Sequence, residues 1–356
     1  MSRRWLAWFC SAAAGAIWLI GCGVPRLRQP AEAKLAFIAD ERIFTAYAFV
    51  AVVTRPQELM KRAHQSRRSA LRRELHRRLR RVTPAAVRRW KRFAKTTYFG
   101  HMSSYLTLVL RCGDPPGFDL QPSRLPKSEL WLFQQLRGLP PQLKDFYQRM
   151  RIDKLWAGYR STHLDLLPPD QRRQLSERIS ALERFITVEQ RYRRYLIAPA
   201  FFYSVDAGIG LALDPDYLIV QDGDPFESDI TVHEVIHAMV DPVVASWLDS
   251  ASAQWLGDRV AAIRERAVID GNYEAADRYL QECVVRSLSY YFFEQIEKRP
   301  RGDILRKVRQ DEAGGLVMVG VFYRRLAEVN PRATAVLKIL KQTFEREMHE
   351  PESMTD

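Results

Sequence analysis

The chain has 356 residues, of which 47% are hydrophobic and 27% charged, so it can bury a sizeable core and is neither wholly disordered nor fibrous. Lys and Arg outnumber Asp and Glu by 55 to 42, a formal charge of +13 that by itself suggests a polyanionic partner. Four Cys are too few for a disulfide scaffold.

The N-terminus has the pattern of an export signal. Arg3 and Arg4 precede an uncharged apolar stretch, Trp5–Ile20, which is short for a membrane-spanning helix. The segment ends in Leu-Ile-Gly-Cys, which resembles the lipobox of bacterial lipoproteins, with cleavage before Cys22 and acylation of its thiol. We therefore expect a signal peptide over 1–21, a lipid anchor with palmitate at Cys22 and a tether over 22–35. The other interpretation is an ordinary signal anchor with a chance Cys.

The sequence predicts an exported protein that is lipid-anchored in the bacterial cell envelope. The residue after Cys22 is Gly23 rather than the Asp that often marks inner-membrane retention, which favours the outer membrane. Two Cys remain in the body of the chain, Cys112 and Cys283, and in an oxidising compartment they form either one disulfide or two buried thiols.

The positive charge is concentrated in residues 55–95, which hold 16 Lys or Arg against two Glu, while the rest of the exported chain is slightly acidic. Leu71, Leu75, Leu79 and Val82 recur at helical spacing, and Thr83-Pro84 marks the start of a second helix that carries Val87 and Trp90. We interpret this segment as basic amphipathic helices that either bind anionic lipid or an acidic cell-wall polymer or form a solvated surface. An exported lipoprotein rarely meets nucleic acid, so we expect no nucleic-acid partner.

The remaining chain indicates an α+β fold that is mostly helical. Helical spacing continues to about residue 186, and short β-prone runs follow at 201–203, 209–211 and 217–220. Amphipathic runs then predict helices at about 254–269, 273–297 and 316–347. We expect one domain over 36–347, with the basic helices in its N-terminal part, and a flexible tail over 348–356.

The chemistry is concentrated after the last β-prone run. His233 and His237 are four residues apart on a predicted helix that Pro242 would end, so both imidazoles leave the same face and can share a metal ion. Glu234, next to the first His, can then act as general base on a water. The other interpretation is a helix with two satisfied His and a surface Glu.

A catalytic zinc site needs a third protein ligand. Glu282 lies in the otherwise apolar segment 279–288, an expensive place for an unpaired carboxylate, so it is the expected ligand. Arg286, one turn later, can form a plain ion pair with Glu282, and it can at the same time orient the carboxylate as a ligand. The rival carboxylates are Glu265, Glu274 and Glu294.

The segment Val232-His233-Glu234-Val235-Ile236-His237, followed by Glu282-Cys283-Val284-Val285-Arg286, resembles the gluzincin arrangement of zinc metallopeptidases. It is most similar to an uncharacterised bacterial family, classed as a domain of unknown function, with a downstream Glu-x-x-Val-Arg motif. The resemblance covers about residues 215–295. In that family we expect Ala where Ser287 stands and Asn where Asp241 stands.

The resemblance implies a zincin-like fold, with a small sheet before the His-Glu-x-x-His helix, and a membrane-tethered zinc metallopeptidase that hydrolyses peptide bonds. Zn²⁺ would be held by His233, His237 and Glu282, and Glu234 would accept and pass on the proton. From its place one turn beyond His237, Asp241 either orients an imidazole, caps the helix end or faces water. The donor that stabilises the oxyanion stays open among Tyr203, Tyr290, Tyr291, His101 and His163.

A second function fits the same sequence. The chain would then be a non-catalytic envelope lipoprotein that binds lipid or cell wall through its basic helices and keeps the zinc site for structure or as a relic.

Overall fold

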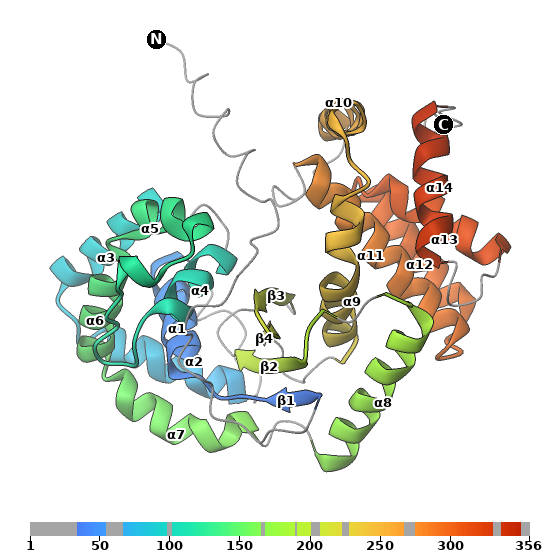
Figure 1. The fold of residues 1–356 in the computed structure, drawn as a ribbon. Helices are drawn as coiled ribbons and strands as arrows, with labels where there is room; N and C mark the ends of the chain where they lie inside the picture. Colours follow the sequence, from blue (N-terminus) through green and yellow to red (C-terminus); the bar gives the residue numbers. More distant parts are fainter. Residues whose placement is uncertain are drawn as a thin grey trace, which may run out of the picture. The chain divides into compact units, whose positions relative to one another are not determined.

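The structure is a computed structural model that describes residues 34–54, 67–97, 102–164, 168–188, 191–200, 207–222, 228–266, 275–329 and 336–349. These residues are mostly helical and include one small mixed sheet, which confirms the α+β class (Figure 1).

The described residues fall into two compact units. The sheet unit comprises those of 17–174 and 192–234, and the helical unit those of 175–191 and 235–356. The division falls inside α9 (Ser228–Ala245), a continuous helix. The expectation of a single domain over 36–347 therefore stays a prediction.

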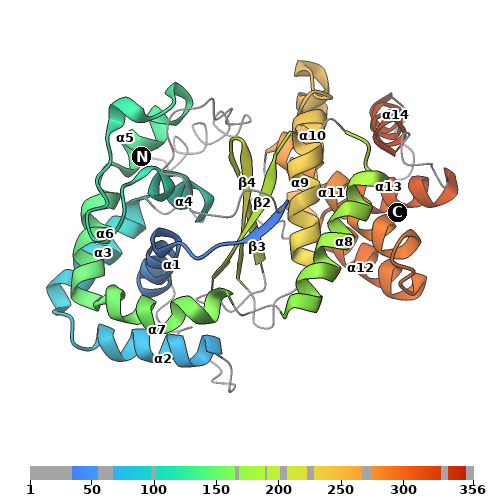
Figure 2. The ribbon, with the colours of Figure 1, turned by 60° about the horizontal axis from the view of Figure 1, so that its bottom comes forward.

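The sheet has the order β1-β2-β4-β3, formed by β1 (Leu35–Phe37), β2 (Arg194–Ala200), β4 (Asp216–Asp222) and β3 (Ala207–Leu213) (Figure 2). Neighbouring strands are parallel except β3, which is antiparallel to β4 and is one of the two outer strands, with β1 at the other edge. The β-prone runs at 209–211 and 217–220 are confirmed as β3 and β4. The run at 201–203 lies outside the described residues, and β1 and β2 were not predicted.

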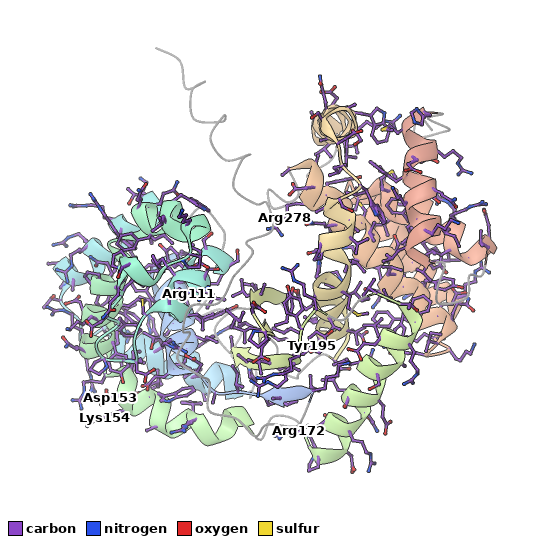
Figure 3. All side chains as sticks on the ribbon, viewed as in Figure 1. Arg111, Asp153, Lys154, Arg172, Tyr195 and Arg278 are labelled. Carbon is purple, nitrogen blue, oxygen red and sulfur yellow. The ribbon has the colours of Figure 1, made fainter. Side chains whose placement is uncertain are left out.

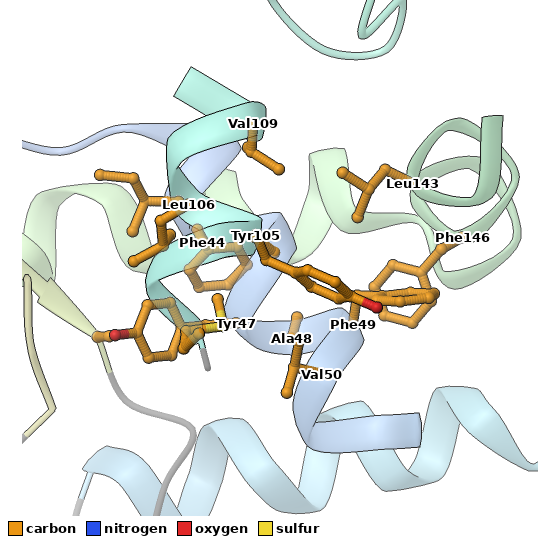
Figure 4. Packing of buried hydrophobic residues seen from close by; sticks show 14 of the residues in the cluster. Phe44, Tyr47, Ala48, Phe49, Val50, Tyr105, Leu106, Val109, Leu143 and Phe146 are labelled. Carbon is orange, nitrogen blue, oxygen red and sulfur yellow. The ribbon is translucent and has the colours of Figure 1, made fainter. Parts of the chain in front are cut away.

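The hydrophobic core of the sheet unit is built around α1 (Glu41–Thr54), which is buried from Arg42 to Val53. It packs against α4 (Met102–Arg111) and α6 (Leu139–Met150) (Figure 4). The rings of Phe49 and Phe146 meet edge to face with their centroids 5.3 Å apart, and Trp90 meets Phe146 in the same way at 5.1 Å. The unit is completed by α5 (Leu130–Leu136), α7 (Ile152–Leu164) and two short 3₁₀ turns (Pro122–Arg124 and Lys127–Glu129). The unit also contains a buried ion pair, because Arg111 on α4, which is labelled in Figure 3, pairs with Glu129 at 2.9 Å.

The two predicted basic helices are present as α2 (Arg67–Leu79) and α3 (Pro84–Thr97). Leu71 and Leu75 are fully buried, and so is Trp90. The second helix begins at Pro84, as Thr83-Pro84 predicts, because a Pro at the first position gives up an N–H that has no partner inside the helix.

The helical unit contains most of α8 (Pro169–Phe185), the second part of α9, and α10 (Ser250–Arg266), α11 (Ala276–Gln295), α12 (Arg301–Ala313), α13 (Val317–Val329) and α14 (Val336–His349). Its centre is α11, which packs against α10, α12 and α13 and is buried along most of its length. The run predicted over 316–347 is helical in its described parts, α13 and α14, and residues 330–335 lie outside the described residues.

Among the residues described here, no helix combines the length and the apolarity needed to cross a membrane. The predicted signal peptide, the Cys22 anchor and most of the predicted tether and tail lie outside them, and the last tether residue, Leu35, already belongs to β1. Cys112 and Cys283 are both free and buried, which settles the earlier alternative in favour of two thiols. Burial raises the pKa of the Cys112 thiol to about 12.

Candidate metal centre

The helix α9 presents the His-Glu-x-x-His motif. Val232, Val235 and Ile236 are fully buried and fix the helix in the surrounding core. Thr231 also donates its hydroxyl hydrogen to the side-chain oxygen of Gln221 on β4, at 2.8 Å, which ties the start of the helix to the sheet. The prediction that Pro242 ends the helix was wrong, because α9 continues through Pro242 to Ala245. A Pro removes one backbone hydrogen bond, and the last turn forms without it.

The three predicted ligands lie together. Ligand atoms of His233, His237 and Glu282 are within 4.8 Å of one another, and they come from α9 and α11. The Nε2 atom of His237 is 3.3 Å from Oε2 of Glu282. Two ligands of a tetrahedral zinc ion, each about 2.0–2.2 Å from it, are roughly 3.3–3.6 Å apart. The His237–Glu282 pair thus already has the separation that a shared zinc ion requires.

Glu282 is only 4% exposed on α11, as the apolar segment around it predicts. Its other oxygen, Oε1, accepts a hydrogen bond from Nε of Arg286 at 2.5 Å. Of the rival carboxylates, Glu294 lies three turns further along α11, about 18 Å at 1.5 Å per residue, and pairs with Tyr323. The side chains of Glu265 and Glu274 lie outside the described residues.

The far side of the His237 ring is held by Asp241, whose two oxygens lie 3.0 and 3.1 Å from Nδ1. This contact leaves Nε2 facing Glu282 and fixes which ring nitrogen is available to a metal. Burial lowers the pKa of His237, but the carboxylates of Asp241 and Glu282 outweigh it and hold the pKa well above 6.5. Without a metal, the two carboxylates therefore favour the protonated, positively charged form of His237.

Glu234, the proposed base, is 8% exposed and lies against β3. A Cβ atom at Gly208 would stand 2.7 Å from Oε1 of Glu234, and one at Gly210 would stand 2.8 Å from Oε2. Because both distances are shorter than a carbon–oxygen contact, the carboxylate occupies space that only glycine leaves free. Residues 208 and 210 lie on the same face of the sheet, so the Glu234 carboxylate packs against the two glycines of β3.

A Cβ atom at Gly210 would also collide with the hydroxyl of Tyr217 on β4, which places this phenol beside Glu234. The Tyr217 ring packs on Tyr192 and Tyr195 at centroid distances of 5.0 and 6.5 Å, and Tyr195 is labelled on the sheet in Figure 3. The sequence analysis did not single out Tyr217 or the two glycines. The signal that identifies them is tertiary, since it is the approach of α9 to β3.

Two of the five candidates for the oxyanion donor have other contacts in the structure. Tyr290 donates its hydroxyl hydrogen to Oδ2 of Asp311 at 2.6 Å, and Tyr291 stacks on Phe185. Tyr203, His101 and the side chain of His163 lie outside the described residues. Asp311 itself was missed by sequence analysis and also contacts Arg286, through Nη1 at 2.7 Å.

The structure describes the basic segment from residue 67 onward, and residues 55–66 lie outside the described residues. On α3 four exposed cations, Arg88, Lys91, Arg92 and Lys95, follow helical spacing on the side opposite buried Trp90. The helix contains no acidic residue, and in the described part of the chain none of the four is paired with a carboxylate. They form a continuous positive stripe, which we call the α3 stripe.

Comparison of the chain with protein-family models, with curated proteins and with solved structures found no match. The resemblance to gluzincins therefore depends on the motif residues alone.

Proposed function

We propose that the protein is a zinc metallopeptidase with Glu234 as general base. The single observation that carries the proposal is the ligand cluster, in which His237 Nε2 and Glu282 Oε2 lie 3.3 Å apart beside His233. The donor set of two imidazoles and one carboxylate is one that catalytic zinc uses, and it leaves a fourth position for water or substrate.

The described side chains divide the chemistry between them. A zinc ion, when bound, supplies a Lewis acid that polarises a carbonyl group and acidifies a water. Glu234 would accept a proton from the attacking water and deliver it to the leaving amine. Asp241 holds His237 in the tautomer that exposes Nε2, and Arg286 occupies the Glu282 oxygen that points away from His237.

The position of β3 supports a peptide as substrate. It is one of the two outer strands of the sheet in the described residues, and one of its faces carries Gly208 and Gly210 against Glu234. An extended peptide can pair with the open edge of such a strand through backbone hydrogen bonds. A peptide bound there would have its backbone close to the proposed base.

The test is Glu234→Gln, which keeps the size of the side chain and removes its basicity. We expect the variant to bind one zinc ion like the wild type and to lose hydrolysis of a peptide library by at least 100-fold. Glu328→Gln on α13, which changes an exposed carboxylate, is the matched control and should hydrolyse normally. Undiminished hydrolysis by Glu234→Gln would overturn the assignment of the base.

We further propose that Cys22 carries the lipid that tethers the enzyme to the cell envelope. Support comes from the apolar segment and the Leu-Ile-Gly-Cys sequence alone. Metabolic labelling with palmitate should mark the wild type and leave Cys22→Ser unlabelled.

The second candidate function, binding to anionic lipid or cell wall without catalysis, is favoured by one observation, the α3 stripe. Cations spaced along one solvated helix face attract an anionic surface at about 1 kcal/mol each near the surface. Replacement of Arg88, Lys91, Arg92 and Lys95 by Gln should abolish salt-sensitive sedimentation with phosphatidylglycerol vesicles. The matched control replaces Arg184, Lys307, Arg309 and Lys338, four exposed cations of the helical unit, by Gln. Stoichiometric zinc with no turnover of any peptide, together with such vesicle binding, would favour this function over the peptidase.

A further inference from the structure

Polar side chains follow one face of α11, beginning at the ligand cluster and continuing toward the C-terminal end of the helix. Glu282, Arg286 and Tyr290 follow one another at intervals of four residues, so they project from the same side of the helix. Asp311 of α12 lies beside this row and contacts its last two members. All four residues belong to the helical unit.

The two oxygens of Glu282 have different partners. Oε2 is 3.3 Å from Nε2 of His237, and Oε1 accepts a hydrogen bond from Nε of Arg286 at 2.5 Å. Arg286 thus determines which oxygen is turned toward the imidazole. A guanidinium group can also bind both oxygens of a carboxylate side by side, and in that arrangement it would compete with a metal for Oε2.

Asp311 opposes that competing arrangement. Its Oδ1 accepts a hydrogen bond from Nη1 of Arg286 at 2.7 Å, so one end of the guanidinium is held by Asp311 and the other by Glu282. The Asp311 carboxylate is itself fixed, because its Oδ2 accepts the hydroxyl hydrogen of Tyr290 at 2.6 Å. The Asp311 side chain is only 12% exposed, which limits the water that could replace these contacts.

We propose that Asp311, held by Tyr290, is a positioning residue for the metal ligand Glu282 and acts through Arg286. Its carboxylate keeps the guanidinium on Oε1 and thereby leaves Oε2 for a divalent metal ion. This inference rests on the proposed metal site. It gives α12 a role in metal binding, although none of the proposed ligands lies on that helix.

The experiment measures the zinc affinity of the full chain by competition with a chromophoric chelator. Asp311→Asn should weaken zinc binding by about 10-fold or more, the range seen when a group that orients a ligand is lost. Tyr290→Phe, a milder change that keeps the ring, should weaken it by a smaller factor. Asp303→Asn is the matched control, because Asp303 pairs with Arg306 on the exposed side of the same helix, and it should bind zinc like the wild type.

Two further measurements separate positioning from a purely structural role. In an Arg286→Gln background, Asp311→Asn should cause no additional loss of affinity, because the residue through which it acts is gone. Asp311→Glu, which restores the carboxylate, should recover part of the affinity. The d–d absorption of the cobalt-substituted protein should shift in Asp311→Asn, since the carboxylate ligand is reoriented.

The outcomes distinguish the two claims. If the wild type binds zinc and Asp311→Asn and Tyr290→Phe bind it with unchanged affinity, the inference is overturned and the zinc site stands. Lower thermal stability of metal-free Asp311→Asn with unchanged zinc affinity would overturn it in the same way. A wild type that binds no zinc would overturn the proposed metal site and this inference together.

Discussion

Replacing Gly210 by Ala tests the fit between β3 and the proposed base. The added Cβ would stand 2.8 Å from Oε2 of Glu234 and closer still to the hydroxyl of Tyr217. An ordinary carbon–oxygen contact is near 3.3 Å, so the carboxylate must retreat by about half an ångström, or the strand must. A displacement of about 1 Å of a catalytic group costs roughly 100-fold in rate. We therefore expect kcat/KM to fall by about 10- to 100-fold.

The assay pairs peptide hydrolysis with zinc content. Zinc binding should be unchanged in Gly210→Ala, because His233, His237 and Glu282 are not touched by the new methyl group. Gly257→Ala is the control, since a Cβ at Gly257 on α10 meets nothing within 4 Å, and it should hydrolyse peptides at the wild-type rate. Full activity of Gly210→Ala would refute the placement of Glu234 against the strand.

Three further predictions concern the ligands and the core. Asp241→Asn should weaken zinc binding by about 10- to 100-fold, because an amide can contact Nδ1 of His237 but lacks the negative charge of the carboxylate. Competition with a chelator measures this loss, and an affinity equal to that of the wild type would contradict the role of Asp241. The pKa of His237 lies well above 6.5, so zinc binding at pH 7 should release a proton. Zinc affinity should therefore rise as pH rises toward that pKa. Calorimetry in buffers of different ionisation enthalpy should then give different apparent binding enthalpies. The same shift means that stability from charged His237 is fully present below pH 6.5 in the metal-free protein and is lost as pH rises through the folded pKa. Phe146→Ala should lower the free energy of unfolding by about 3–5 kcal/mol in guanidinium denaturation, because the ring is fully buried between Phe49 and Trp90; a loss below about 1 kcal/mol would refute this packing.

The ligand cluster was predictable because two short-range rules determine it. A spacing of four puts His233 and His237 on one helix face, and a buried carboxylate in an apolar stretch needs a partner, which identified Glu282. Both rules act within one helix, so they need no knowledge of the fold. The structure brings the three residues together on α9 and α11.

The surroundings of the cluster were not predictable in the same way. Asp311 is 25 residues from Arg286 in the sequence, and its acidic side chain on a polar helix gives no sign that it turns inward. In the sequence, Gly208 and Gly210 only interrupt a β-prone run. Their role becomes visible in the structure, where Glu234 of α9 packs against them. These contacts depend on how elements pack, which the period of a single element does not encode.

The fold shows the same contrast. The mostly helical α+β class and the strands β3 and β4 follow from local patterns, whereas β1 pairs with β2 across about 160 residues and is only three residues long. The helix α1 is apolar around its whole circumference and carries no amphipathic period to identify it. The sequence predicts that the helix ends at Pro242, yet α9 continues past this residue to Ala245.

The central claim is that His233, His237 and Glu282 bind one zinc ion. Crystals of the zinc-loaded chain, measured on both sides of the zinc absorption edge, test it most directly. The account predicts one anomalous peak about 2.0–2.2 Å from Nε2 of His237, from Oε2 of Glu282 and from a ring nitrogen of His233. A peak elsewhere, or a Glu282 carboxylate bound to Arg286 through both oxygens with no metal beside it, would contradict it.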